Sequence, residues 1–193
     1  MKTKQNIIFT AAVLIVTIYT SVFAFSHPIY ILDCICAYLA IGVFFSLERK
    51  YPLKPWLIVL GVAPFILELT GLAFGFFAFS ILGFGFDKML HFFNSLIITV
   101  LLYFWISTSD TKHKGIKIII AMLVVIGLGS MEEIFEFVGQ RYFHVFGPGM
   151  FSQGDLLPST LKNDLVNYDT WWDMICNFIG ASFAGIILLI KKE

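Results

Sequence analysis

The sequence predicts an all-α integral membrane protein, a single domain of six transmembrane helices with both termini in the cytoplasm. Composition is the first reason: the 193 residues are 59% hydrophobic and only 13% charged, whereas soluble domains carry about 25% charged residues. The second is that six apolar stretches reach the length of about 20 residues with which a helix crosses a bilayer. The third is that basic residues gather in alternate loops between these stretches.

The six predicted spans cover residues 7–25, 28–46, 56–75, 86–106, 116–142 and 171–190. The first also fits a signal peptide, because Lys2 and Lys4 precede it and residues 22–24 resemble a cleavage site. A retained first helix is the favoured interpretation, because five more spans follow. Residues 76–86 are apolar but too few to cross again, and we expect a partly buried or interfacial loop there.

The lysines and arginines alternate between the two sides of the predicted spans. Short loops that hold these residues stay in the cytoplasm. With the N-terminus inside, only Lys88, Arg141 and Lys162 of the 13 basic residues lie outside. This pattern supports six spans and predicts a multi-pass protein of the cytoplasmic (inner) membrane of a prokaryote. The formal net charge of zero offers no basic surface for nucleic acid, so membrane lipids are the expected partners.

Residues 143–170 form the long hydrophilic loop of the chain, expected on the outer side. Its glycines and prolines, among them Gly147, Pro148 and Gly149, predict irregular structure. Loops of this length in compact chains are usually functional or disordered. The segment fits a lid over a site and a plain surface loop equally well.

Acidic, histidine and amide residues gather near the outer ends of five spans, beginning with Asp33 in the second. Helical spacing places each group on one face of its helix, and those faces also carry small residues, so we expect them to point into the bundle. The residues so placed are Glu68 in the third span, Asp87 and His91 in the fourth, Glu132, Glu133 and Glu136 in the fifth, and Asp173 and Asn177 in the sixth.

Structural roles fit some of these residues as well. Asp87 fits an N-cap, Asp173 fits the first turn of a helix, and a lone histidine is often a hydrogen-bonded structural residue. The glutamates of the fifth span differ, because they lie at a helix C-terminus, where the macrodipole disfavours negative charge. They need compensation from Arg141, Lys88 or His91, or from a divalent cation. Carboxylates inside a membrane indicate a functional site.

Carboxylate and imidazole groups on neighbouring helices resemble the metal sites of helix bundles. Such mixed ligands suit Zn, Mn, Fe or Mg without selecting one of them. No HExxH, GxSxG or glycine-rich phosphate loop is present. We predict catalytic roles for Asp87, His91, Glu133 and Asp173, metal ligation by His91, Glu132, Glu136 and Asp173, and substrate binding by Lys88, Arg141, Asn177 and Glu68.

Several motifs resemble those of VanZ-like and YjdF-type membrane proteins. Residues 86–92 (FDKMLHF) resemble the VanZ-like DKxxHF motif, and residues 132–137 (EEIFEF) are similar to the ExxE helix of the YjdF-type inner-membrane family. Residues 153–155 (QGD) with residues 169–174 (DTWWDM) and 177–180 resemble the QGD…DTxxDM and NxxG segments of that family. In this chain 13 residues separate the QGD segment from the DTWWDM segment, whereas the two segments lie close together in the family. The resemblance implies a small polytopic protein of the cell envelope, with a link to glycopeptide resistance and no particular reaction.

Three functions remain open at this point. The first is a metal-dependent hydrolase or transferase that acts on a lipid or lipid-linked envelope substrate. The second is an ion- or proton-coupled transporter whose carboxylates bind the ion, although no internal repeat is visible. The third is a non-catalytic envelope or resistance component whose polar network sets the helix register.

Overall fold

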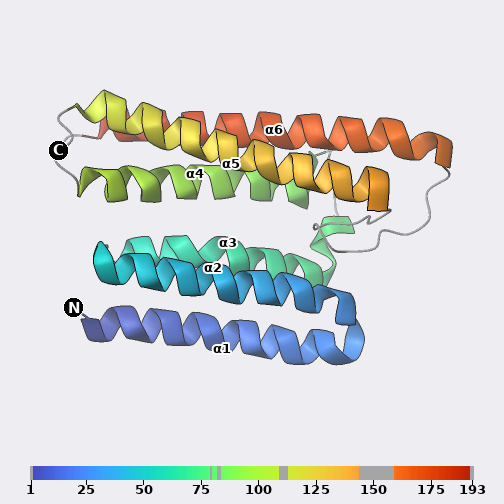
Figure 1. The fold of residues 1–193 in the computed structure, drawn as a ribbon, viewed down its shortest axis with the longest axis horizontal. Coiled ribbons are helices and arrows are strands. Elements are labelled where there is room, and N and C mark those ends of the chain that lie inside the picture. The colour runs from blue at the N-terminus through green and yellow to red at the C-terminus, as the bar shows by residue number, and fades with distance from the viewer. Residues whose placement is uncertain (1, 79, 82–83, 109–112, 144–158, 192–193) are drawn as a thin grey trace. The chain divides into compact units, whose positions relative to one another are not determined.

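The computed structural model describes residues 2–78, 80–81, 84–108, 113–143 and 159–191 of the chain. Contacts divide the chain into two compact units, Met1–Ala78 and Phe79–Glu193. The first unit contains α1 (Lys2–Ser26), η1 (Pro28–Tyr30), α2 (Ile31–Lys50), α3 (Pro55–Phe74) and η2 (Phe76–Ala78) (Figure 1). The second contains β1 (Ser80–Ile81), β2 (Phe84–Gly85), α4 (Phe86–Ser107), α5 (Lys114–Phe143) and α6 (Ser159–Ile190).

Six helices among the described residues are long and apolar enough to cross a membrane. They are Lys4–Ser26, Ile31–Lys50, Pro55–Phe74, Phe86–Ser107, Lys114–Gly139 and Asp169–Ile190. Many large apolar side chains on these helices are exposed, including Ile18, Leu123 and Ile190. Soluble proteins rarely expose contiguous apolar surface on this scale, whereas lipid tails accommodate it. The predicted helical membrane class and its six spans are confirmed.

The helices extend beyond several of the predicted spans, most of all at α6. This helix begins at Ser159, which corrects the prediction of irregular structure up to residue 170. The glycines and prolines behind that prediction all precede Ser159. A helix satisfies its own backbone hydrogen bonds, so it can extend beyond the end of an apolar stretch. Residues 144–158 lie outside the described residues, and a lid formed by them stays a prediction.

The described residues between α3 and α4 contain no helix long enough to cross a membrane. α3 ends at Gly75, whose φ of 67° is the left-handed conformation that glycine adopts without steric penalty. The short helix η2 follows, and β1 then pairs antiparallel with β2, with Ser80 opposite Gly85 and Ile81 opposite Phe84. The expected interfacial loop therefore contains a small hairpin that leads directly into α4.

Within the first unit, α1, α2 and α3 pack through aromatic and small residues. The Phe9 ring of α1 lies 5.7 Å from the Phe44 ring and 4.7 Å from the Phe45 ring of α2. A Cβ added at Gly61 of α3 would overlap the Phe44 ring, so glycine is the residue that admits this ring. Across α1 and α3, the hydroxyls of Tyr19 and Thr70 share a 2.8 Å hydrogen bond.

Within the second unit, α4, α5 and α6 lie side by side (Figure 1). A Cβ added at Gly180 of α6 would overlap the carbonyl oxygen of Phe92 in α4, so the two backbones approach closely there. Near the other end of the three helices, buried apolar residues form the core. Its members are Tyr103, Ile118, Ala121 and Leu188.

Candidate metal centre

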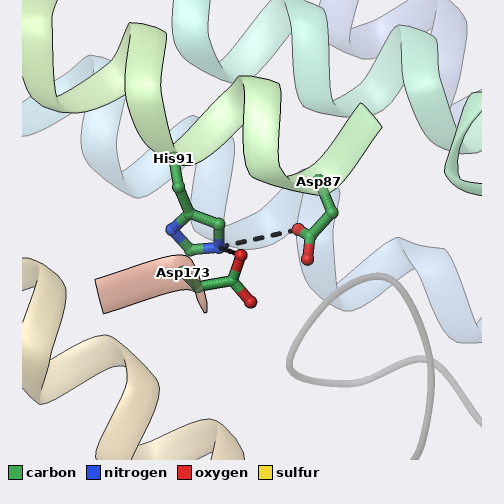
Figure 2. Close-up of side chains that lie close together, drawn as sticks. All are labelled: Asp87, His91 and Asp173. Atoms are coloured by element: carbon green, nitrogen blue, oxygen red, sulfur yellow. Dashed lines mark ion pairs between the residues drawn. The ribbon is translucent and has the colours of Figure 1, made fainter. Parts of the chain in front are cut away.

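The first two turns of α4 contribute three charged or titratable side chains, Asp87, Lys88 and His91. The N-cap of α4 is Gly85, so Asp87 lies in the first turn and is not the N-cap. A carboxylate in this turn is favoured by the helix dipole. Because residues four apart share a helix face, His91 Nε2 lies 3.5 Å from Asp87 Oδ1 (Figure 2).

α6 brings a second aspartate to the same imidazole nitrogen. Asp173 is only 1% exposed, and its Oδ1 lies 3.8 Å from His91 Nε2. One donor atom from each of Asp87, His91 and Asp173 lies within 4.8 Å of the other two, and the three side chains converge in Figure 2. We call this group, with Glu133 and Lys88, the acidic cluster.

α5 contributes the buried carboxylate of Glu133, which is 1% exposed and whose Oε1 lies 3.3 Å from His91 Nε2. Its neighbours on the helix are placed differently: Glu132 is exposed and Glu136 is half-buried. A helix turns about 100° per residue, so adjacent glutamates cannot share one direction. Of these three glutamates, only Glu133 is therefore fully buried.

Lys88 lies among carboxylates. Its Nζ lies 3.0 Å from Asp87 Oδ2 and 2.8 Å from Asp173 Oδ2, and it also pairs with Asp169 Oδ1. An ammonium group has three N–H donors, and three carboxylates receive them. Together with Asp169, the acidic cluster has four carboxylates and one lysine, so it carries three excess negative charges when all of them are ionised and His91 is neutral.

Two buried carboxylate oxygens of the cluster have no hydrogen-bond partner among the described residues. They are Glu133 Oε1 and Asp173 Oδ1. Both lie close to His91 Nε2, at 3.3 and 3.8 Å, but without hydrogen-bond geometry. Buried polar atoms in folded proteins are nearly always satisfied by protein, water or an ion. These two oxygens are available to a positively charged ligand.

A polar row continues from the cluster into the helix bundle on the other side of the imidazole. Asn177 Nδ2 lies 3.3 Å from His91 Nδ1, and Ser95 Oγ donates to Asn177 Oδ1 at 2.6 Å. Thr99 Oγ1 donates to the backbone oxygen of Ser95 at 2.7 Å. Ser95, Thr99 and Asn177 are all buried. The hydrogen-bonding capacity of His91 Nδ1 is therefore engaged with protein.

The four predicted catalytic residues, Asp87, His91, Glu133 and Asp173, come together in the acidic cluster. Of the predicted metal ligands, His91 and Asp173 belong to the close donor group, whereas Glu132 and Glu136 do not. Of the predicted substrate-binding residues, Lys88 and Asn177 adjoin His91 or its carboxylates. Glu68 lies on α3 of the first unit, and the side chain of Arg141 lies outside the described residues.

Asp169 and Ser95 belong to this site although neither was a predicted site residue. Helical spacing is the signal that points to both, because Asp169 precedes Asp173 by four residues and Ser95 follows His91 by four. Asp169 precedes the predicted start of the last span, and Ser95 lies on the predicted polar face of the fourth span without an assigned role.

Comparison with known proteins supports the membrane class. Residues 6–193 match the family described as "Predicted membrane protein (DUF2238)". No curated protein and no solved structure matched the chain. Because the match spans nearly the whole sequence and agrees with six candidate spans, the chain belongs to the predicted membrane protein family DUF2238.

Proposed function

We propose that the acidic cluster binds a divalent cation through Asp87, His91 and Asp173, and that the protein uses it to hydrolyse or transfer a lipid or lipid-linked envelope substrate. The observation that carries this proposal is the convergence of three donor atoms, from two helices, within 4.8 Å of one another. Mixed imidazole and carboxylate ligands suit Zn, Mn or Fe, and Mg accepts the carboxylates.

The spacing of the donors supports a cation. With metal–ligand bonds of about 2.1 Å, two ligands on one edge of a tetrahedron lie about 3.4 Å apart. The distances from His91 Nε2 to Asp87 Oδ1 and Asp173 Oδ1 are 3.5 and 3.8 Å. Only small side-chain movements would therefore bring the donors into coordination distance.

The charge of the cluster supports the same conclusion. Buried carboxylates without enough counter-charge are costly, and each needs pairing, protonation or a bound cation. A divalent cation would neutralise two of the three excess charges. It would also satisfy Asp173 Oδ1, which has no hydrogen-bond partner among the described residues.

The geometry suggests a role for Lys88 other than the predicted contact with substrate. Since its three donors face Asp87, Asp169 and Asp173, we assign it to holding the two ligand carboxylates in place. A bound cation would polarise a substrate oxygen and activate water at neutral pH. Glu133 lies beside His91 without being one of the three proposed ligands, and we assign it the role of accepting the proton from the attacking nucleophile.

The proposal of a lipid or lipid-linked substrate rests on the membrane location of the protein and on the family motifs. The cluster lies at the N-terminal end of α4, which the distribution of basic residues assigns to the outer side of the membrane. Lipid head groups occupy that depth. The resemblance of the motifs around Asp87, Glu132 and Asp173 to VanZ-like and YjdF-type proteins supports a role at the cell envelope of a prokaryote.

The test is elemental analysis of the full chain purified in detergent, before and after loading with Zn, Mn, Fe or Mg. We expect about one cation per chain in the wild type and loss of binding in His91→Ala and Asp173→Asn. Glu132→Gln is the matched control, since this exposed glutamate lies outside the donor group. A folded wild-type protein that takes up no cation would overturn the proposal. Mass spectrometry of lipid extracts incubated with loaded protein then identifies the substrate.

Cation translocation is the second candidate, favoured by the buried row of Ser95 and Thr99 that leads away from the cluster. Intramembrane polar rows often mark ion pathways. Cation flux into proteoliposomes that depends on Thr99, in protein that converts no lipid, would favour transport over catalysis.

A further inference from the structure

We infer that Asn177 is a positioning residue which selects the tautomer of His91, and that its side-chain amide turns over when His91 Nε2 binds a cation. This inference rests on the proposed function for its second part, whereas the first part concerns the protein without a cation. Its basis is the chain of contacts from His91 Nδ1 through Asn177 to Ser95.

The contacts define one state of the imidazole. The amide nitrogen of Asn177 is a donor only, and it faces His91 Nδ1 at 3.3 Å. Nδ1 must therefore accept, and in the neutral ring the proton lies on Nε2. This proton lies on the side of the ring that faces the carboxylates, where Asp87 Oδ1 is 3.5 Å from Nε2. This tautomer suits a cluster that is held together without a cation.

Cation binding requires the other tautomer. Nε2 can ligate only through its lone pair, so the proton must move to Nδ1. Two donors, Nδ1–H and the Asn177 amide nitrogen, would then face each other. Turning the amide over removes this conflict, because Oδ1 of Asn177 then accepts from Nδ1–H. A ligating histidine commonly donates its second N–H to such an oxygen, which fixes the ring.

The surroundings of Asn177 accept both orientations of the amide. Ser95 Oγ donates to Oδ1 in the first orientation, at 2.6 Å. In the second orientation the amide nitrogen donates to Ser95 Oγ, because a hydroxyl both donates and accepts. The serine proton then turns toward a backbone carbonyl of the preceding helix turn. The side-chain amide of Asn177 and the hydroxyl of Ser95 therefore keep hydrogen-bond partners in either state.

Gly129 of α5 provides the space for this amide. A Cβ added at Gly129 would lie 2.6 Å from Asn177 Nδ2 and 2.9 Å from Asn177 Cγ. Real Cβ atoms do not approach other atoms so closely, so alanine at this position displaces the amide. Gly127, two residues earlier on the same helix, has no atom within 4 Å of an added Cβ and is the matched control.

The experiment combines ¹⁵N NMR of histidine-labelled full-length protein in detergent with zinc titration. His91→Gln identifies the His91 signals among the four histidines. In zinc-free wild type we expect the proton on Nε2. In Asn177→Asp, whose carboxylate can only accept, we expect it on Nδ1. Asn177→Leu and Gly129→Ala should lose the wild-type preference and bind zinc about 10–100-fold more weakly, as for other lost partners of ligating histidines. Gly127→Ala should match the wild type.

The outcomes separate this inference from the proposed function. A wild type that binds no zinc overturns the proposed function and the turnover of the amide, but the zinc-free tautomer shift in Asn177→Asp still supports tautomer selection. If zinc-free wild type carries the proton on Nδ1, or if Asn177→Leu keeps both the wild-type tautomer and the wild-type zinc affinity, the inference is wrong.

Discussion

Lys88 Nζ lies 2.8 Å from Asp173 Oδ2 and so joins the first turn of α4 to α6 across 85 residues of sequence. Both groups are almost fully enclosed by protein, whereas the third carboxylate at this ammonium, Asp169, has a side chain that is 45% exposed. An ion pair gains little in water and much more where the dielectric is low. The two aspartates therefore differ in what they contribute to stability.

Replacing Lys88 by Met should destabilise the protein by about 3–5 kcal/mol, because it leaves a buried carboxylate without its partner. In double-mutant cycles, the coupling of Lys88 with Asp173 should clearly exceed its coupling with Asp169, which solvent limits to about 1 kcal/mol. Denaturant unfolding in detergent measures both. Equal coupling energies for the two aspartates would show that burial does not distinguish these pairs.

Glu133→Gln and Glu132→Gln compare adjacent glutamates that differ in burial. Removing the buried charge of Glu133 relieves repulsion in a cluster with excess negative charge. The melting temperature of cation-free protein should therefore rise, by the equivalent of about 1–3 kcal/mol. The Glu132 variant should melt like the wild type. Thermal denaturation in chelator checks this, and identical behaviour of the two variants would show that Glu133 adds no charge repulsion to the cluster.

Cation addition should raise the melting temperature of the wild type. At a cation concentration 100 times the Kd, linkage predicts a stabilisation of about 2.7 kcal/mol. His91→Ala and Asp173→Asn should lose this shift because each removes one of the three converging donors. A shift that survives in both variants would locate the cation elsewhere in the protein.

Gly180→Ala should destabilise the packing of α4 against α6 by about 1–3 kcal/mol, the usual cost of overpacking. The added methyl group meets the backbone carbonyl of Phe92, which cannot move without shifting the helix. Gly127→Ala is the control: it has open space and should be neutral or slightly stabilising, since alanine favours a helix. The free energy of unfolding should therefore fall in Gly180→Ala and stay unchanged or rise slightly in Gly127→Ala.

The orientation of the chain can be tested with reporter fusions. Lys112 and Lys114 predict that the connection between α4 and α5 is cytoplasmic. Green fluorescent protein fused after residue 112 should fluoresce, and alkaline phosphatase fused after residue 150 should be active. The reverse pattern would place the acidic cluster on the cytoplasmic side of the membrane.

The sequence by itself determined the membrane class, the six spans and most members of the candidate site. Helix formation and span length depend on local hydrogen bonding and on the apolar character of about 20 consecutive residues, which can be read along the chain. Spacing of four residues likewise placed Asp87 with His91 and Asp173 with Asn177 on common helix faces. The start of α6 was missed because an apolar stretch marks the bilayer and not the end of the helix.

Only the tertiary structure decided which glutamate of α5 enters the site and what Lys88 contacts. Glu132, Glu133 and Glu136 are chemically alike, and the rotation of α5 against α4 and α6 selects Glu133. That rotation depends on packing between helices, including the space left by Gly129 and Gly180. The pairing of Lys88 with Asp173 depends in the same way on how closely two helices distant in sequence approach, which no local pattern encodes.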